Sequence, residues 1–117
     1  MSSEDIEFHF ANTVMPVKDA KQAANYYREI LGFTIDVLWK NPNYACVSRG
    51  GITIELGEGR PTHVGSGACV IQVSNVDNLY EELKTRGANL VGDFTERDYG
   101  SKDFRVKDKD GNLLIFG

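Results

Sequence analysis

The feature that most constrains the fold is an internal repeat that covers about half of the 117-residue chain. Apolar and glycine positions recur in the same order when the two halves are aligned: Val14 and Val17 align with Val70 and Val73, Gly32 aligns with Gly87, and Gly51 aligns with Gly111. A repeat of this length indicates two copies of one supersecondary unit. One unit alone buries too little apolar surface to be stable, so two units, or two chains, must share a core.

The first half predicts a strand, a helix and three further strands. Residues 8–17 are typical of a strand, and Asp19 can cap the helix with Gln22 as its capping-box partner. Helical spacing relates the apolar residues that precede Gly32, a natural stop: Ala23, Tyr27, Ile30 and Leu31. Three strands are then expected at residues 33–39, 44–48 and 52–56, with a tight turn at Gly50-Gly51.

The second half repeats that order after a polar, Gly-rich linker at residues 57–67. The expected elements are a strand at 68–73, a helix that carries Val76, Leu79, Tyr80 and Leu83 and ends at Gly87, and strands at 90–91, 103–107 and 112–116. Asp110-Gly111 predicts a hairpin between the last two. We therefore predict an α+β domain over residues 1–117, built from two βαβββ modules at about 7–57 and 67–117. Two such units side by side make a cleft, because each helix covers only one sheet face.

Charge and composition exclude several classes of partner. The net charge is −4 and no cluster of Lys and Arg occurs, which argues against nucleic acid. No apolar run is long enough for a membrane span, and the acidic start of the sequence lacks the features of a signal peptide. We expect a cytoplasmic protein in which Cys46 and Cys69, each within an apolar run, are buried free thiols.

Two segments of the sequence resemble a known superfamily. The first half contains VMPVKD at 14–19, YY at 26–27 and LGF at 31–33, and the second contains YGSKDFRVKDKDGN at 99–112. These resemble the opening module and the closing motif of the glyoxalase/bleomycin-resistance/dioxygenase (vicinal oxygen chelate) superfamily, bleomycin-resistance-like members in particular. The resemblance runs from Phe8 to Phe116, and Lys109 replaces a proline that is usual in the closing motif. Members range from isomerases to sequestering proteins, so the resemblance implies the fold more narrowly than the function.

The resemblance also implies where a divalent metal ion would bind. Its four ligand positions fall at Asn12, Glu55, Ala68 and Ile115. Only Glu55 is a good ligand, and Asn12 offers one neutral oxygen, so we expect no metal and no cofactor. Neither histidine replaces the lost donors, because His9 should face the other side of its strand and His63 lies in the linker.

Six residues remain as candidates for ligand binding: Asp36, Trp39, Tyr44, Glu55, Tyr99 and Arg105. The aromatic rings can stack on a planar or cationic ligand, and the resemblance implies that Tyr99 lies beside bound drug. Alternatives stay open for three of the six. Trp39 can pack in its hairpin, Tyr44 can belong to the core, and Glu55 can be a relic held by Arg105 or by Asn12.

The leading hypothesis is a metal-free homodimer that sequesters an aromatic, hydrophobic or cationic small molecule in clefts shared between its chains and so confers antibiotic resistance without chemistry. The alternative is a lyase, isomerase or dioxygenase of the same superfamily, with a metal held in an unusual register or with Glu55 acting alone as acid and base. A regulatory subunit without a ligand is a third class. No catalytic residue is assigned, because no triad, phosphate loop or pair of acid and base carboxylates occurs in the sequence.

Overall fold

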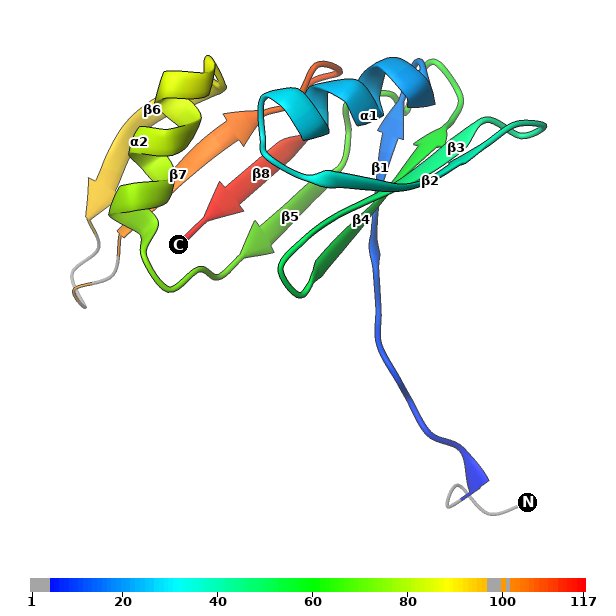
Figure 1. Cartoon of the computed structure of the whole chain (residues 1–117), viewed down its shortest axis with the longest axis horizontal. Helices are drawn as coiled ribbons and strands as arrows, with labels where there is room; N and C mark the ends of the chain where they lie inside the picture. Colours follow the sequence, from blue (N-terminus) through cyan, green and yellow to red (C-terminus); the bar gives the residue numbers. More distant parts are fainter. Residues whose placement is uncertain (1–4, 97–99, 101) are drawn as a thin grey trace.

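The computed structural model describes residues 5–96, 100 and 102–117, which form two four-stranded sheets and two helices (Figure 1). The elements are β1 (Thr13–Val17), α1 (Ala20–Glu29), β2 (Thr34–Trp39), β3 (Tyr44–Arg49), β4 (Ile52–Glu58), β5 (Ala68–Ile71), α2 (Val76–Arg86), β6 (Asn89–Glu96), β7 (Lys102–Lys107) and β8 (Leu113–Phe116).

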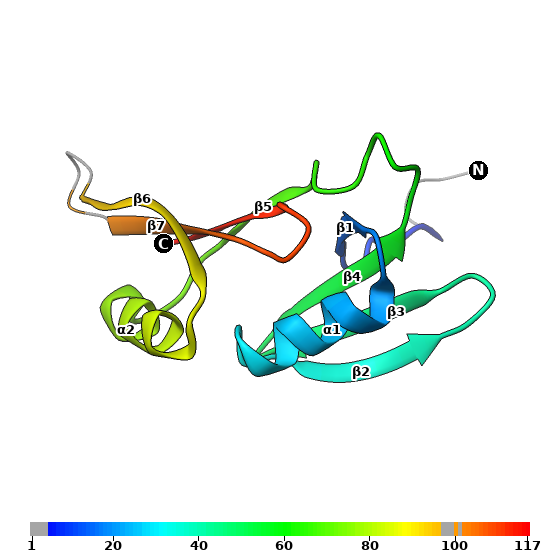
Figure 2. The same cartoon turned by 90° about the horizontal axis from the view of Figure 1, so that it is seen from above.

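The two halves have the same topology, which confirms the predicted fold class. The strand order is β1-β4-β3-β2 in the first sheet and β5-β8-β7-β6 in the second. In each sheet the first and last strands of the module pair in parallel and the other neighbours are antiparallel. Each helix packs beside the sheet of its own module, α1 by the first and α2 by the second, as Figure 2 shows. Each sheet therefore has one face toward its helix and one open face.

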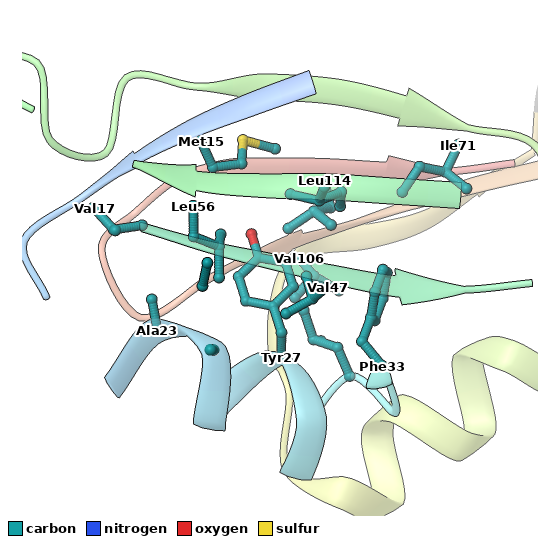
Figure 3. Close-up of a cluster of buried hydrophobic side chains, with 14 of the residues drawn as sticks. Met15, Val17, Ala23, Tyr27, Phe33, Val47, Leu56, Ile71, Val106 and Leu114 are labelled. Atoms are coloured by element: carbon teal, nitrogen blue, oxygen red, sulfur yellow. The ribbon is translucent and has the colours of Figure 1, made fainter. Parts of the chain in front are cut away.

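The apolar core lies on the helix side and joins the two modules. Alternate residues of the strands point into it, among them Met15 and Leu56 of the first sheet and Leu114 of the second (Figure 3). Tyr27 reaches into the core from α1, and its ring meets that of Phe33 edge to face at 5.6 Å. The prediction that two units share one core is thus met within a single chain.

The capping and turn residues behave as the sequence predicts. The carboxylate of Asp19 accepts a hydrogen bond from the backbone N–H of Gln22 at 2.9 Å and starts α1. Gly87 ends α2 with a φ of +87°, a conformation that costs a residue with a Cβ about 1 kcal/mol or more. Gly50 and Gly111 likewise have positive φ at their hairpin turns.

Two predicted strands differ from the observed ones by more than two residues in length. The strand expected at 8–17 begins only at Thr13, because the preceding residues pair with no other strand, and residues 6–12 extend away from the body (Figure 1). The short strand expected at 90–91 is the eight-residue β6. Gly92 has a φ of +72° and interrupts the pairing between Val91 and Thr95, after which the strand continues. A glycine bulge resembles a strand end in sequence.

A buried polar network, which the sequence analysis missed, ties the β7–β8 hairpin to the first module. Asp108 accepts hydrogen bonds from the Tyr27 hydroxyl at 2.7 Å and from the Asn112 side chain at 3.0 Å. The Asn112 amide also donates to the carbonyl of Pro16 and accepts from the N–H of Gly67. Burial, and then the Asp108 carboxylate, raise the pKa of Tyr27 far above its usual value, so its hydroxyl remains a donor.

No helix in the part of the chain that the structure describes is long and apolar enough to cross a membrane.

Candidate functional site

The open face of the first sheet consists of the side chains that point away from α1, arranged in rows across the four strands. One row runs Val14, Glu55, Cys46 and Val37, and the next runs Pro16, Gly57, Tyr44 and Trp39. The first row places a carboxylate among apolar groups and a thiol, and the second ends in two aromatic rings. This surface brings together three of the predicted ligand-binding residues: Trp39, Tyr44 and Glu55.

Among residues 5–96, 100 and 102–117, Glu55 is held by Asn12 and by no cation. The Asn12 side-chain amide donates to one Glu55 carboxylate oxygen at 2.7 Å, from the residue just before β1. Glu55 is half-buried, and its other carboxylate oxygen has no hydrogen-bond partner among the described residues. A half-buried carboxylate with one neutral donor keeps unused acceptor capacity, so it can accept from a further donor or pair with a cation.

Trp39 and Tyr44 form the aromatic edge of this face. They lie opposite each other where β2 and β3 meet, and the Trp39 side chain is 61% exposed. The Tyr44 ring lies over Gly57: two of its ring carbons are 3.7 Å from the position that a Gly57 Cβ would occupy. Tyr44 is therefore half-buried on the open face and does not belong to the core, which excludes the core alternative for this residue.

Asp36 lies at the irregularity between Ile35 and Val37, where the pairing of β2 with β3 shifts. It is exposed and influences Cys46, whose pKa is raised mainly by burial and then by the Asp36 carboxylate. Cys46 and Cys69 were both expected to be buried but are only partly so, and Cys46 lies beside Glu55 in the same row. The alternation of Tyr44, Cys46 and Ser48 along β3 is the signal that would have placed the thiol on this face.

Arg105 lies on the second sheet, in register with Ile115 and Val91. The alternative in which Arg105 holds Glu55 is therefore wrong for this structure, because the hydrogen bond of Glu55 goes to Asn12. Tyr99, the remaining candidate, is outside the described residues.

The residues at the four metal positions do not fit a divalent ion. The register is equivalent in the two modules, since Val14 pairs with Glu55 as Val70 pairs with Ile115, with Asn12 and Ala68 two residues earlier. Ala68 and Ile115 have no donor atom, and one carboxylate with one amide is too few for Zn²⁺ or Ni²⁺. Within residues 5–96, 100 and 102–117, no group of three His, Cys, Asp or Glu side chains could hold a metal.

A groove of about 500 Å³ runs beside Asn12, between the two modules. Residues 10–13 and 51–54 line one side of it, and residues 69–71 of β5 line the other. Ligand pockets commonly have volumes of about 300–1,000 Å³. The groove is thus large enough for part of a small molecule that also reaches Glu55.

Comparison with known proteins places this arrangement in a family. Residues 9–116 match the family described as the Glyoxalase/Bleomycin resistance protein/Dioxygenase superfamily. The chain belongs to this superfamily. Among curated members, the bleomycin resistance protein of Geobacillus stearothermophilus is 28% identical over 120 residues, which cover 87% of this chain and 90% of that protein.

Two solved structures are similar to the superfamily fold of this chain. The bleomycin-binding protein from bleomycin-producing Streptomyces verticillus, in complex with copper(II)-bleomycin, has a TM-score of 0.80 at 22% identity and covers 95% of this chain and 96% of its own. TnmS3, an antibiotic binding protein from Streptomyces sp. CB03234, has a TM-score of 0.79 at 23% identity and covers 95% of each chain. At these identities the likeness establishes the fold.

Proposed function

We propose that this protein binds and sequesters an aromatic or cationic antibiotic on the open face of the first sheet. The observation that carries the proposal is Glu55, a half-buried carboxylate with unused acceptor capacity, one row from the exposed ring of Trp39 and the half-buried ring of Tyr44. The corresponding position in the second module is Ile115, whose side chain cannot ligate a metal, so we assign Glu55 to ligand binding and not to a metal site. Both the curated relative named a bleomycin resistance protein and the bleomycin-bound structure support this ligand class.

Within this proposal each side chain has a separate role. The rings of Trp39 and Tyr44 stack on a planar part of the ligand, and Glu55 and Asp36 attract its positive charge. Tyr99 and Arg105 complete the proposed set from the second module. Resistance follows from tight binding alone, without a catalytic residue. We place the protein in the cytoplasm, since the two free thiols suit a reducing compartment.

We further propose that the protein is a homodimer whose second copy packs against the open faces and encloses the ligand in clefts shared between the two chains. Val14 and Val70 are 52% and 70% exposed at matched positions of the two sheets. Phe8 and Phe10, on the extended segment before β1, are 97% and 84% exposed. Unburied apolar surface of this kind marks an interface.

The binding test is a titration with bleomycin that follows the fluorescence of Trp39, the only tryptophan in the chain, with calorimetry as a second readout. Glu55→Gln should weaken binding and reduce its dependence on salt, because the variant loses an ionic contact. Glu81→Gln, the same change at an exposed position of α2, should leave both unchanged. Failure of bleomycin and other planar cations to bind, together with turnover of a hemithioacetal or a catechol on addition of metal, would refute the proposal.

The assembly test is sedimentation velocity at micromolar concentration. We expect a dimer that the double variant Phe8→Ser/Phe10→Ser weakens. A wild-type protein that remains monomeric over the micromolar range contradicts the dimer.

A further inference from the structure

The open face of the second sheet carries two cationic side chains on one strand. Residues alternate along β7, so that Phe104 and Val106 are buried while Arg105 and Lys107 are exposed on the opposite side. Two residues apart on a strand, the two positions are about 7 Å from each other. Within the described ranges, neither side chain has an ion pair, whereas Arg49 and Arg86 are both bound to Glu82. Asp103, one step further along this face, has an interaction of its own.

An aliphatic strip lies directly beside these cations. Ile115 of β8 is opposite Arg105, and Leu113 is opposite Lys107. On the next strand, β5, Val70 pairs with Ile115 and Ala68 with Leu113. Because neighbouring strands are about 4.8 Å apart, this strip and the two cations form a patch about 10 Å wide. That width matches one or two fused aromatic rings with a charged group at one side.

The chemistry of this patch differs from that of the first sheet. At the corresponding register positions the first sheet has Glu55 in place of Ile115 and Cys46 in place of Arg105. An unpaired guanidinium presents a planar fork of N–H donors that fits a carboxylate, sulfate or phosphate. Two adjacent cations also stand out in a chain whose net charge is −4.

We propose that Arg105 and Lys107 form an anion subsite, which takes the acidic group of a ligand whose apolar body lies on Ala68, Val70, Leu113 and Ile115. This inference rests on the proposed binding function and narrows its ligand class. A ligand that spans both sheets carries a negative group for the second sheet as well as a ring or a cation for the first.

The test compares two fluorescent probes that share a ring system. 8-Anilinonaphthalene-1-sulfonate carries a sulfonate, and N-phenyl-1-naphthylamine is the same amine without it. Arg105→Gln should weaken binding of the sulfonate about tenfold and remove most of its salt dependence, and Lys107→Gln should do so to a smaller extent. The neutral probe should bind the variants as it binds wild type. Lys21→Gln, which removes an exposed cation from α1, is the matched control.

Three results would overturn the inference. The first is a wild-type protein that binds the sulfonate no better than the neutral probe. The second is an equal loss of both probes in Arg105→Gln, which would make the site purely apolar. The third is a loss of self-association in Arg105→Gln with unchanged sulfonate binding, which would pair these cations with acids of a second copy. None of these three results would contradict bleomycin binding that depends on Glu55. The experiments therefore test the anion subsite and the proposed binding function independently.

Discussion

The two modules have one topology but different surfaces. In the first, α1 buries three alanines and Tyr27, and the open sheet face carries an amide, a carboxylate, a thiol and two rings. In the second, α2 buries Leu83 as its one fully buried residue, and the open face carries aliphatic side chains and two cations. The pairing of strands depends on apolar alternation and turns, which both halves retain. The open faces contribute little to that pairing, so their chemistry is free to diverge.

We expect the largest effect on stability from a substitution at Asn112, whose side chain connects the two modules. This side chain is 0% exposed, and its amide bonds to Pro16, Gly67 and Asp108. Asn112→Ala leaves buried groups of both modules unpaired, and we expect a loss of about 3–5 kcal/mol in the free energy of unfolding. Urea denaturation measures it. Asn43→Ala, at an exposed turn, should cost less than about 0.5 kcal/mol. Similar values for the two variants would mean that the modules do not depend on this network.

A smaller effect is expected at Tyr27, the other side of the same network. Tyr27→Phe keeps the ring in the core but removes the hydrogen bond to the buried Asp108. Hydrogen bonds to charged groups contribute about 1.5–3 kcal/mol, and we expect a loss in that range by urea denaturation. Tyr26→Phe is the natural control, because the Tyr26 side chain is only partly buried and its hydroxyl donates a long hydrogen bond of 3.4 Å to the Lys107 carbonyl. A cost at Tyr26 that equals the cost at Tyr27 would argue against a special role for Asp108.

The difference between the open faces is tested by paired substitutions at matched positions. Trp39 lies opposite Tyr44 on the first sheet, as Thr95 lies opposite Asp103 on the second. Trp39→Ala should weaken bleomycin binding by about 1–2 kcal/mol, roughly 5- to 30-fold, with little change in stability because the ring is exposed. Calorimetry is the readout, since the variant has no tryptophan. Thr95→Ala should bind bleomycin as wild type does. A larger loss of binding in Thr95→Ala than in Trp39→Ala would contradict the placement of the aromatic subsite on the first sheet.

The smallest effect concerns the ion pair that crosses between the modules on the helix side. Arg49 of β3 donates two hydrogen bonds to the Glu82 carboxylate of α2, each 2.8 Å long, and holds the pKa of Glu82 below its usual 4.5. A lowered pKa stabilises the fold above about pH 4.5, and that contribution is lost as the pH falls further. Since both side chains are partly exposed, Glu82→Gln should cost about 1 kcal/mol or less at pH 7.

Thermal or urea unfolding of wild type and Glu82→Gln across the pH range measures this contribution of the Arg49–Glu82 ion pair. The difference between wild type and Glu82→Gln should be constant above pH 5 and should shrink as the pH falls below 4.5. A difference that grows in acid would have the opposite sign and would contradict the lowered pKa.

The sequence predicts the fold well because the signals that determine it are local. Asp19, Gly87 and the two hairpin glycines each act within a few residues, and the repeat supplies the topology. Contacts between residues that are far apart in the sequence were harder to predict. Asp108 lies two residues before the predicted Asp110-Gly111 turn, and only the folded chain brings it to Tyr27, 81 residues away. The partner of Glu55 stayed undecided between Asn12 and Arg105 for the same reason, because sequence spacing does not indicate which strand edges meet.

The hairpin network has a consequence for the order in which the chain can fold during synthesis. Asp108 and Asn112 are translated about 80 residues after Tyr27, and β8 is an interior strand of its sheet, between β5 and β7. The first sheet can assemble while the rest of the chain is still on the ribosome. Until Asp108 has been synthesised, however, the Tyr27 hydroxyl of α1 has no partner in the core of the first module. Completion of the first module therefore waits for the end of the second, and a stalled or truncated nascent chain exposes a target for chaperones and proteases.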